Sequence, residues 1–249
     1  MERPKMNIYD SLIVGSGYSS VGYASANANT LICEEHQICD TGFYLPMRTF
    51  RYVPYVPRSA VGEELFRIFN SLSLFDGKCQ NLSGFEYAIS RYIADKGINL
   101  LLRCRAVNIS PLPDGILDVT LSCSEGLVHV LTRKIIDTTA TGGRKKYTVL
   151  FVTDKIETER DKILAAFDGA QIEPAFYKGR YALHLSPEST DENLVKLEIY
   201  KKWKSLDTSA KILYMSPVFY SEGTSVLCDG KFLNPIEAFE AGYFYKEAE

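Results

Sequence analysis

The sequence lacks several features that would assign it to a common class of protein. It has no apolar run near the roughly 18 residues of a membrane-spanning helix, and its first residues contain no apolar core of a secretory signal. Its charge is nearly balanced, because 28 Lys and Arg face 31 Asp and Glu, for a formal net charge of -3. Such a chain as a whole attracts neither a nucleic-acid backbone nor an anionic membrane. We therefore expect no nucleic-acid partner and no membrane partner.

Cysteine and histidine occur without the spacing of a metal or redox site. The six cysteines include no Cys-x-x-Cys pair and do not cluster with the three histidines, so we expect no metal site. In a chain of 249 residues without a secretory signal, we expect reduced thiols and a cytoplasmic protein. Lone residues of these types are more often packed or exposed than catalytic. The sequence therefore identifies no catalytic residue among Cys39, His36, His129 and His184.

The composition that is present is that of an ordinary folded protein. Hydrophobic residues make up 46% and charged residues 24% of the chain. The length suits one large domain or a domain that carries an inserted lobe. Tyrosine (16 residues) and phenylalanine (13 residues) are plentiful, which favours aromatic packing or a pocket for a flat ligand.

A glycine-rich turn follows the first apolar segment. Residues 9–14 (YDSLIV) form a short run that stops at Gly15, which is typical of a buried parallel strand. The pattern G-x-G-x-x-S comes next, and a stretch of small residues after it favours a closely packed helix. Gly15 permits the tight turn, Gly17 lets a pyrophosphate approach the backbone, and the small Ser20 lets the helix lie close to the strand. The N-terminus of such a helix directs free N–H groups at phosphates.

A second apolar strand, residues 30–33, ends in two acids. Glu34 and Glu35 follow Gly15 by about the 20 residues at which a dinucleotide-binding fold places its ribose-binding acid. The strand, the glycine turn, the small-residue helix and the acid together predict a dinucleotide site.

Three separated segments resemble FAD-dependent oxidoreductases of the glutathione-reductase-like flavoprotein group. The first is YDSLIVGSGYSSVGYASANANTLICEE, the second is RKIIDTTATGG (133–143), and the third is SVLCDGKFLNPIEAFEAG (225–242). The chain resembles a minimal member of that group with a single dinucleotide motif. The resemblance implies an α/β protein: a Rossmann-like FAD-binding domain with a parallel sheet and an antiparallel insert, plus a small α+β substrate lobe.

The same resemblance implies a set of FAD-binding residues. Glu34 would bind the adenosine ribose, and Asp229 would lie by the pyrophosphate or the ribityl chain. Pro235 and Ile236 would begin a helix whose positive end faces the isoalloxazine ring. Arg48 is expected either at the cofactor or an anionic substrate, or on the surface. The full set is Gly15, Gly17, Ser19, Ser20, Glu34, Glu35, Arg48, Ala106, Thr141, Gly142, Asp229, Pro235 and Ile236.

The remaining segments predict two domains. Residues 1–146 and 212–249 would form the discontinuous FAD-binding domain, and 147–211 the inserted substrate lobe. Turn residues and alternating apolar positions give the expected elements. In the first domain these are a helix at 84–97 and strands at 98–102, 106–109, 116–123 and 128–137. In the lobe they are strands at 147–153, 171–177, 180–186 and 211–216, with helices at 158–167 and 192–206.

The leading functional hypothesis is an FAD-dependent oxidoreductase. Hydride would pass between a small-molecule substrate and flavin N5, with oxygen or an external partner as the other redox agent. A protein redox partner or a homo-oligomer stays open. One alternative is a flavin-binding subunit of a larger complex with little activity alone. Another is a nicotinamide-only dehydrogenase, which the second and third segments of the resemblance disfavour.

Overall fold

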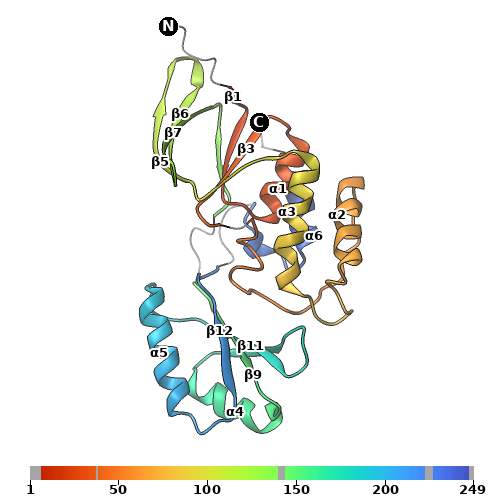
Figure 1. Cartoon of the computed structure of the whole chain (residues 1–249), viewed down its shortest axis with the longest axis vertical. Helices are drawn as coiled ribbons and strands as arrows, with labels where there is room; N and C mark the ends of the chain where they lie inside the picture. Colours follow the sequence, from red (N-terminus) through yellow and green to blue (C-terminus); the bar gives the residue numbers. More distant parts are fainter. Residues whose placement is uncertain (1–6, 38, 140–143, 222–226, 247–249) are drawn as a thin grey trace.

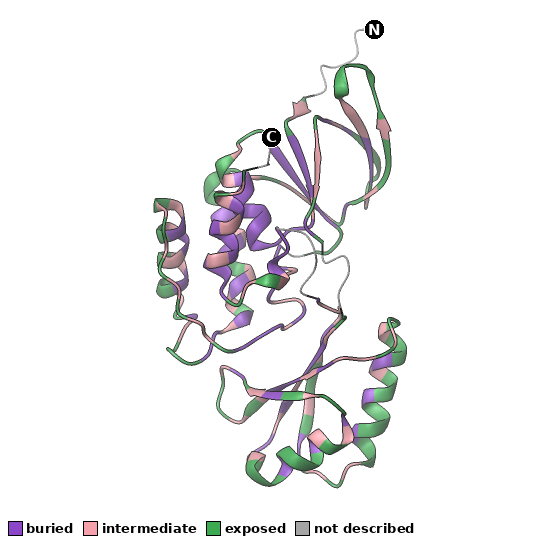
Figure 2. Ribbon diagram, turned by 180° about the vertical axis from the view of Figure 1, so that it is seen from behind, coloured by how far each residue is buried: buried purple, intermediate pink, exposed green. Residues whose placement is uncertain are grey.

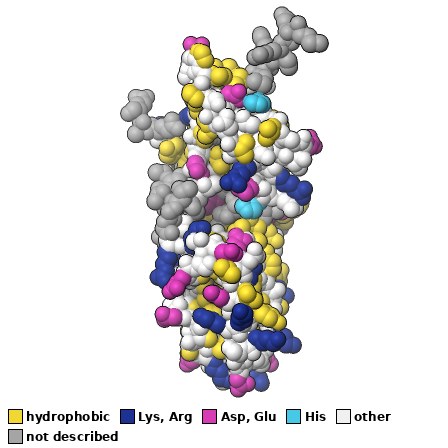
Figure 3. All heavy atoms as spheres, turned by 90° about the vertical axis from the view of Figure 1, so that its left-hand side faces the viewer, with side chains coloured by type: hydrophobic (Ala, Val, Ile, Leu, Met, Phe, Trp, Pro, Cys, Tyr) yellow, Lys and Arg dark blue, Asp and Glu magenta, His cyan; other side chains and the backbone are white. Residues whose placement is uncertain are grey.

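The computed structural model describes residues 7–37, 39–139, 144–221 and 227–246. Its described strands form three four-stranded sheets. Two of them lie at opposite ends of the molecule, and the third lies with the main helices between them (Figure 1). Short 3-10 turns occupy Leu82–Gly84, Pro113–Gly115 and Asp229–Lys231. Acidic and basic side chains are interspersed over the face seen in Figure 3.

The central sheet is parallel throughout. Its order is β4-β3-β2-β8, and every neighbouring pair in it runs parallel. Short apolar runs form these strands, as expected for a sheet covered on both faces. The strands are β2 (Ser11–Val14), β3 (Thr30–Glu34), β4 (Asn99–Leu102) and β8 (Ile135–Asp137).

Alternate residues of the central strands supply two different cores. Ile13 and Ile32 pack in the large cluster with the helices, whereas Leu12 and Leu31 pack against the antiparallel sheet. The helices are α1 (Tyr18–Ala26), α2 (Ala60–Ser71), α3 (Phe85–Lys96) and α6 (Pro235–Tyr243). Figure 2 shows the buried residues gathered where these helices meet the sheet. None of the helices among the described residues has the length and apolar character to cross a membrane.

Helices α1 and α6 cross at two glycines. A Cβ on Gly22 would overlap the carbonyl oxygen of Phe239, and one on Gly242 would overlap the carbonyl oxygen of Ser19. Only glycine allows this approach, which brings the closing helix of the chain onto its first helix. Residues 18–26 and 235–243 are thereby packed together beside the glycine turn.

The second sheet is largely antiparallel and lies beside the central one. Its order is β1-β7-β6-β5, with β1 parallel to β7. The strands are β1 (Ile8–Tyr9), β5 (Arg105–Pro111), β6 (Leu117–Cys123) and β7 (Gly126–Thr132). Two predicted strands are each divided between the sheets: 9–14 separates into β1 and β2, and 128–137 into β7 and β8. The first break falls at Asp10 and the second at Arg133 and Lys134, polar residues that the predicted strands had included.

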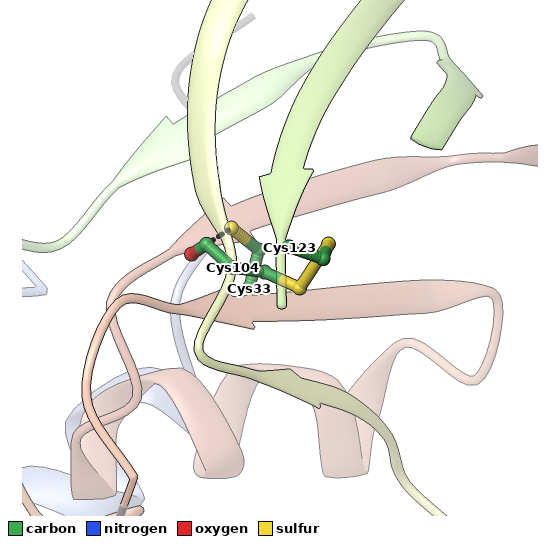
Figure 4. Close-up of a disulfide and its surroundings, with 3 residues drawn as sticks. All are labelled: Cys33, Cys104 and Cys123. Atoms are coloured by element: carbon green, nitrogen blue, oxygen red, sulfur yellow. Dashed lines mark hydrogen bonds between the residues drawn. A yellow bond between two sulfur atoms is a disulfide. The ribbon is translucent and has the colours of Figure 1, made fainter. Parts of the chain in front are cut away.

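The expectation that the thiols are reduced is wrong for one pair. Cys104 and Cys123 form a disulfide, and Cys33 Sγ donates to the carbonyl of Cys104 at 3.2 Å (Figure 4). The antiparallel register explains the pairing, because Arg105 faces Ser122 and the next residues outward are the two cysteines. A sequence separation of 19 carries no signal of such a pairing.

The third sheet has its own core. Its order is β10-β11-β9-β12, all antiparallel, and α4 (Ile156–Ala166) and α5 (Glu192–Ser205) belong to the same segment. Tyr147, Phe151, Ile199 and Trp203 are among the buried residues of this cluster. The strands are β9 (Tyr147–Val152), β10 (Gln171–Pro174), β11 (Arg180–Leu185) and β12 (Lys211–Met215).

Candidate functional site

The glycine turn between β2 and α1 has the backbone that its sequence requires. Gly15 has φ +98°, and a Cβ there would lie 2.7 Å from Thr138 Oγ1. A residue with a side chain would be strained and crowded at this position. Gly17 is the N-cap of α1, and a Cβ on it would overlap the carboxylate of Asp229. Both glycines therefore allow groups from later in the chain to approach the turn.

A pocket of about 250 Å³ opens at this turn. The carboxyl ends of β2, β3 and β8 contribute to it, which is where parallel α/β sheets bind ligands. The segments around Tyr220 and Asp229 close its other side. The predicted residues that line this first pocket are Gly15, Gly17, Ser19, Glu34, Glu35 and Asp229.

Asp229 places a buried carboxyl group at the N-terminus of α1. Its carboxylate accepts hydrogen bonds from Tyr18 N (2.7 Å), Ser19 N (2.9 Å) and Ser19 Oγ (2.6 Å). Burial raises the pKa of Asp229, and the hydrogen bonds from Ser19 and Tyr18 partly oppose that shift. These converging N–H donors are the set that binds a phosphate at a helix N-terminus. The donor chemistry thus fits a pyrophosphate, which would have to take the place of this carboxylate.

Glu34 ends β3 and is also engaged by protein groups. Its Oε2 accepts from Ser16 N at 2.7 Å, and its Oε1 accepts from His36 N at 2.8 Å. Nδ1 of His36 lies 2.7 Å from Oε1. Burial alone would raise the pKa of Glu34, but the hydrogen bonds from His36 and Ser16 outweigh it, so that pKa is lowered. The pKa of His36 is raised in return, first by its hydrogen bond to Glu34. A charged carboxylate is therefore held at the end of β3, where it lines the first pocket.

Several predicted residues lie away from the first pocket. Ser20 is buried, with its hydroxyl 2.9 Å from that of Thr138, so it joins the turn to the strand end after β8. Ala106 lies on β5, and its neighbour Arg105 lines the pocket instead. Thr141 and Gly142 lie outside the described residues.

The N-terminus of α6 is capped by the side chain of the preceding residue. Pro235 occupies the first position of the helix and Ile236 is fully buried. The side chain of Asn234 accepts from Ile236 N at 2.8 Å. The Ile236 N–H is therefore already satisfied, and neither Pro235 nor Ile236 lines the first pocket.

Arg48 is an internal residue. Its guanidinium donates to the carbonyls of Gly230 (2.7 Å) and Phe232 and lies 4.3 Å from the centre of the Phe43 ring. It therefore fixes the segment that follows Asp229. Arg48 also lines a second pocket, which shares Tyr220 and Gly230 with the first.

The second pocket contains residues that sequence reasoning missed. His184, Glu173 and Tyr220 lie there together, from β11, β10 and the segment after β12. These three residues lie far apart in the sequence, and their spacing matches no known sequence motif. Only the pairing of β10 with β11 and the return of the chain after β12 bring them together.

No protein-family model matches the chain, and no curated protein matches it in sequence. Solved structures do match it. The p-nitrophenol 4-monooxygenase PnpA from Pseudomonas putida DLL-E4 has a TM-score of 0.53 and 10% identity, over 87% of this chain and 68% of that one. BexE, studied for oxidation during BE-7585A biosynthesis, has a TM-score of 0.51 and 10% identity, over 86% of this chain and 52% of that one.

The flavin-dependent monooxygenase PieE, solved in complex with FAD and substrate, has a TM-score of 0.50 and 13% identity. The match covers 90% of this chain and 51% of PieE. The chain therefore spans about half the length of PieE and BexE. These likenesses show the fold: a mixed α/β chain with a Rossmann-like architecture that it shares with PnpA, BexE and PieE.

Proposed function

We propose that the chain binds FAD in the first pocket and acts in flavin-dependent oxidation or reduction of a small molecule. The observation that carries this proposal is the donor set at one end of the parallel sheet. Two N–H groups of α1, the Ser19 hydroxyl and the Glu34 carboxylate surround one pocket. The fold shared with flavin-dependent monooxygenases and the three FAD-like sequence segments support the same cofactor.

Each residue in this set has a defined task. Tyr18 N, Ser19 N and Ser19 Oγ would hold the pyrophosphate once the carboxylate of Asp229 has turned away. Glu34 would accept hydrogen bonds from the ribose, and Gly17 keeps the backbone open to the phosphates. FAD supplies the redox chemistry when it is bound, while the protein positions it and sets its electrostatic surroundings. As in the glutathione-reductase-like resemblance, residues 1–146 and 212–249 would hold the cofactor, and 147–211 would cover it.

Oxygen is the reaction partner that we favour. Two of the structural neighbours are named as monooxygenases, and the sequence contains a single dinucleotide motif. Electrons would then enter from the substrate or from an external donor and leave to oxygen. A protein acceptor is the alternative within the same proposal.

A second candidate is a flavin-binding subunit with little activity alone. The length favours it, since the chain spans about half of BexE and PieE. Reduction of FAD bound to the isolated chain distinguishes the enzyme from the flavin-binding subunit. An enzyme reoxidises reduced flavin in air in the presence of its substrate and forms product, whereas the subunit binds FAD without turnover.

The first test is the absorption spectrum of the purified protein. We expect the visible bands of a flavin, and FAD as the chromophore released on denaturation and identified by chromatography. A colourless protein that also takes up no added FAD would contradict the proposal. Bands from a released mononucleotide would keep the flavin and exclude the adenosine role of Glu34.

A further inference from the structure

The second pocket, of about 300 Å³, lies between two parts of the chain. Strands β10 and β11 of the third sheet form one side, and residues 48–53 and 230–233 contribute to the other. The proposed FAD site does not account for the polar groups that gather there.

His184 is the centre of this group. Its Nδ1 lies 3.0 Å from Tyr220 Oη and 3.1 Å from Thr148 Oγ1. Burial raises the pKa of Tyr220 to about 12, so its hydroxyl stays protonated and can donate to Nδ1. A ring nitrogen that accepts a hydrogen bond carries no proton, so His184 then presents its N–H at Nε2. Nε2 is buried and makes no aligned hydrogen bond among the described residues, although Glu173 Oε1 lies 3.1 Å away.

Glu173 is itself occupied by other donors. Its Oε1 accepts from Phe50 N at 2.5 Å, and Thr49 Oγ1 lies 3.3 Å from Oε2. The carboxylate therefore joins the third sheet to the 48–53 segment.

Cationic groups outnumber this one acid around the pocket. Arg48 is 6% exposed, and its Nε makes no hydrogen bond within the described part of the chain. Arg51, which is exposed, and Lys146 also line the pocket. A buried donor without a partner carries a free-energy cost of roughly 1–3 kcal/mol, which a suitable acceptor removes. Arg48 Nε, together with the charges of Arg51 and Lys146, favours a negatively charged acceptor.

The pocket also has an apolar side. Val53, Leu185 and Leu233 line it, and Leu233 is 50% exposed. An inorganic anion would leave these side chains in contact with water. A molecule with a hydrocarbon body would cover them.

We propose that the second pocket binds a small organic acid, with its carboxylate between the Arg48 and His184 side and its hydrocarbon body against Leu185 and Leu233. The proposal goes beyond the proposed function, because neither its residues nor its test requires FAD. If FAD binds the first pocket, the acid lies beside it, since Tyr220 and Gly230 line both pockets.

The test uses pentanoate as the probe and pentanamide as its uncharged analogue. Binding is followed by calorimetry and by the ring ¹⁵N resonances of the three histidines, His36, His129 and His184. We expect pentanoate to bind at least tenfold more tightly than pentanamide and to shift the resonances of His184 alone. Equal binding of the two compounds, or a shift confined to the other histidines, would overturn the proposal.

Two variants and one control test whether pentanoate binds in the second pocket. His184→Gln should weaken pentanoate binding about tenfold, because a hydrogen bond to a charged group is lost. Arg51→Gln changes an exposed side chain, folds with little risk, and should weaken binding up to about fivefold. His129→Gln is the matched control, since His129 also lies on a strand within 3.0 Å of an acid, Asp118, but outside the pocket. Unchanged affinity in both pocket variants would overturn the proposal.

A competition experiment separates this site from the proposed cofactor site. Pentanoate should bind with the same affinity with and without saturating FAD. Mutual exclusion would assign the second pocket to the flavin ring and overturn the inference while supporting FAD binding. A protein that binds pentanoate and takes up no FAD would support the inference and contradict the proposed function.

Discussion

The two pockets share Tyr220 and Gly230 but satisfy their polar groups in opposite ways. In the first pocket, the groups that would hold a ligand are paired with one another. Asp229 takes the N–H groups of α1, and Glu34 takes those of Ser16 and His36. In the second pocket, Arg48 Nε makes no hydrogen bond within the described residues, and His184 Nε2 makes no aligned one, although it lies 3.1 Å from Glu173 Oε1. A ligand of the first pocket must exchange protein hydrogen bonds for its own, whereas a ligand of the second adds bonds.

The difference has a consequence for stability. The first pocket contributes to the folded state without a ligand, because its buried carboxylates are placed by the packing of α1, β3 and the segment before α6. The second pocket leaves Arg48 Nε without an acceptor in the described residues, and this buried donor weakens the folded state until an acceptor arrives. Variants of the first pocket should therefore change both folding and binding. Variants of the second should change binding most.

The largest expected effect comes from separating α1 and α6. Gly22→Val would force a side chain into the carbonyl of Phe239 and move the helix that presents Tyr18 N and Ser19 N. We expect a loss of more than about 3 kcal/mol in the free energy of unfolding, measured with urea. Gly77→Ala is the control, because a Cβ there meets nothing within 4 Å and only the positive φ is strained. Equal losses in both variants would show that the helix contact does not support the first pocket.

The next effect is a pH dependence caused by Asp40, a fully buried acid. Burial, with a contribution from Asp229, raises the pKa of Asp40 from 3.8 to about 7. Between these values the folded protein keeps a proton that the unfolded chain has lost, so stability falls as the pH rises. We expect a decrease of roughly 3 kcal/mol from pH 4 to pH 7 in urea titrations. Asp40→Asn should flatten this decrease, and an unchanged slope would assign it to other groups.

A smaller effect is expected from the acid at the end of β3. Glu34→Ala should weaken FAD binding by about 1–3 kcal/mol in calorimetry, because the ribose loses a charge-assisted hydrogen bond. Glu34→Gln preserves the volume and tests the charge alone. Glu125→Ala is the control, since Glu125 is an exposed acid between β6 and β7 that does not line the first pocket. Unchanged affinity in the Glu34 variants, with Glu125→Ala also unchanged, would remove Glu34 from the site.

The sequence predicted the parts of the first pocket whose requirements are local. Position 15 requires a positive φ, and position 17 has no room for a side chain. Both requirements are visible as glycines in a motif of six residues. The apolar strands beside them are equally local. The approach of Asp229 to Tyr18 N is different, because it joins residues 211 positions apart. The expected place of Asp229, by a pyrophosphate, did not include direct hydrogen bonds to α1.

The parts that could not be predicted depend on pairing between distant segments. The disulfide follows from strand register, and helix α2 went unpredicted although Ser59 caps it and Leu65 and Phe69 are buried. His184 offered no signal as a lone histidine. Its significance comes from Tyr220, which lies 36 positions away on another segment. Composition and periodicity describe one segment at a time. They therefore cannot predict contacts that join two distant segments.

The smallest expected effect tests whether a pyrophosphate replaces the Asp229 carboxylate at the N-terminus of α1. Asp229→Asn removes the charge with which the side chain competes for Tyr18 N and Ser19 N, so we expect FAD and ADP to bind up to about tenfold more tightly. If Asp229 were instead a ligand of the cofactor, the same substitution would weaken binding, and calorimetry distinguishes the two signs. Lowering the pH should imitate the substitution, because the raised pKa of Asp229 brings protonation, and loss of the competing charge, closer to neutral pH. The pH effect should then be absent in Asp229→Asn, whereas its persistence there would place the competing anion elsewhere.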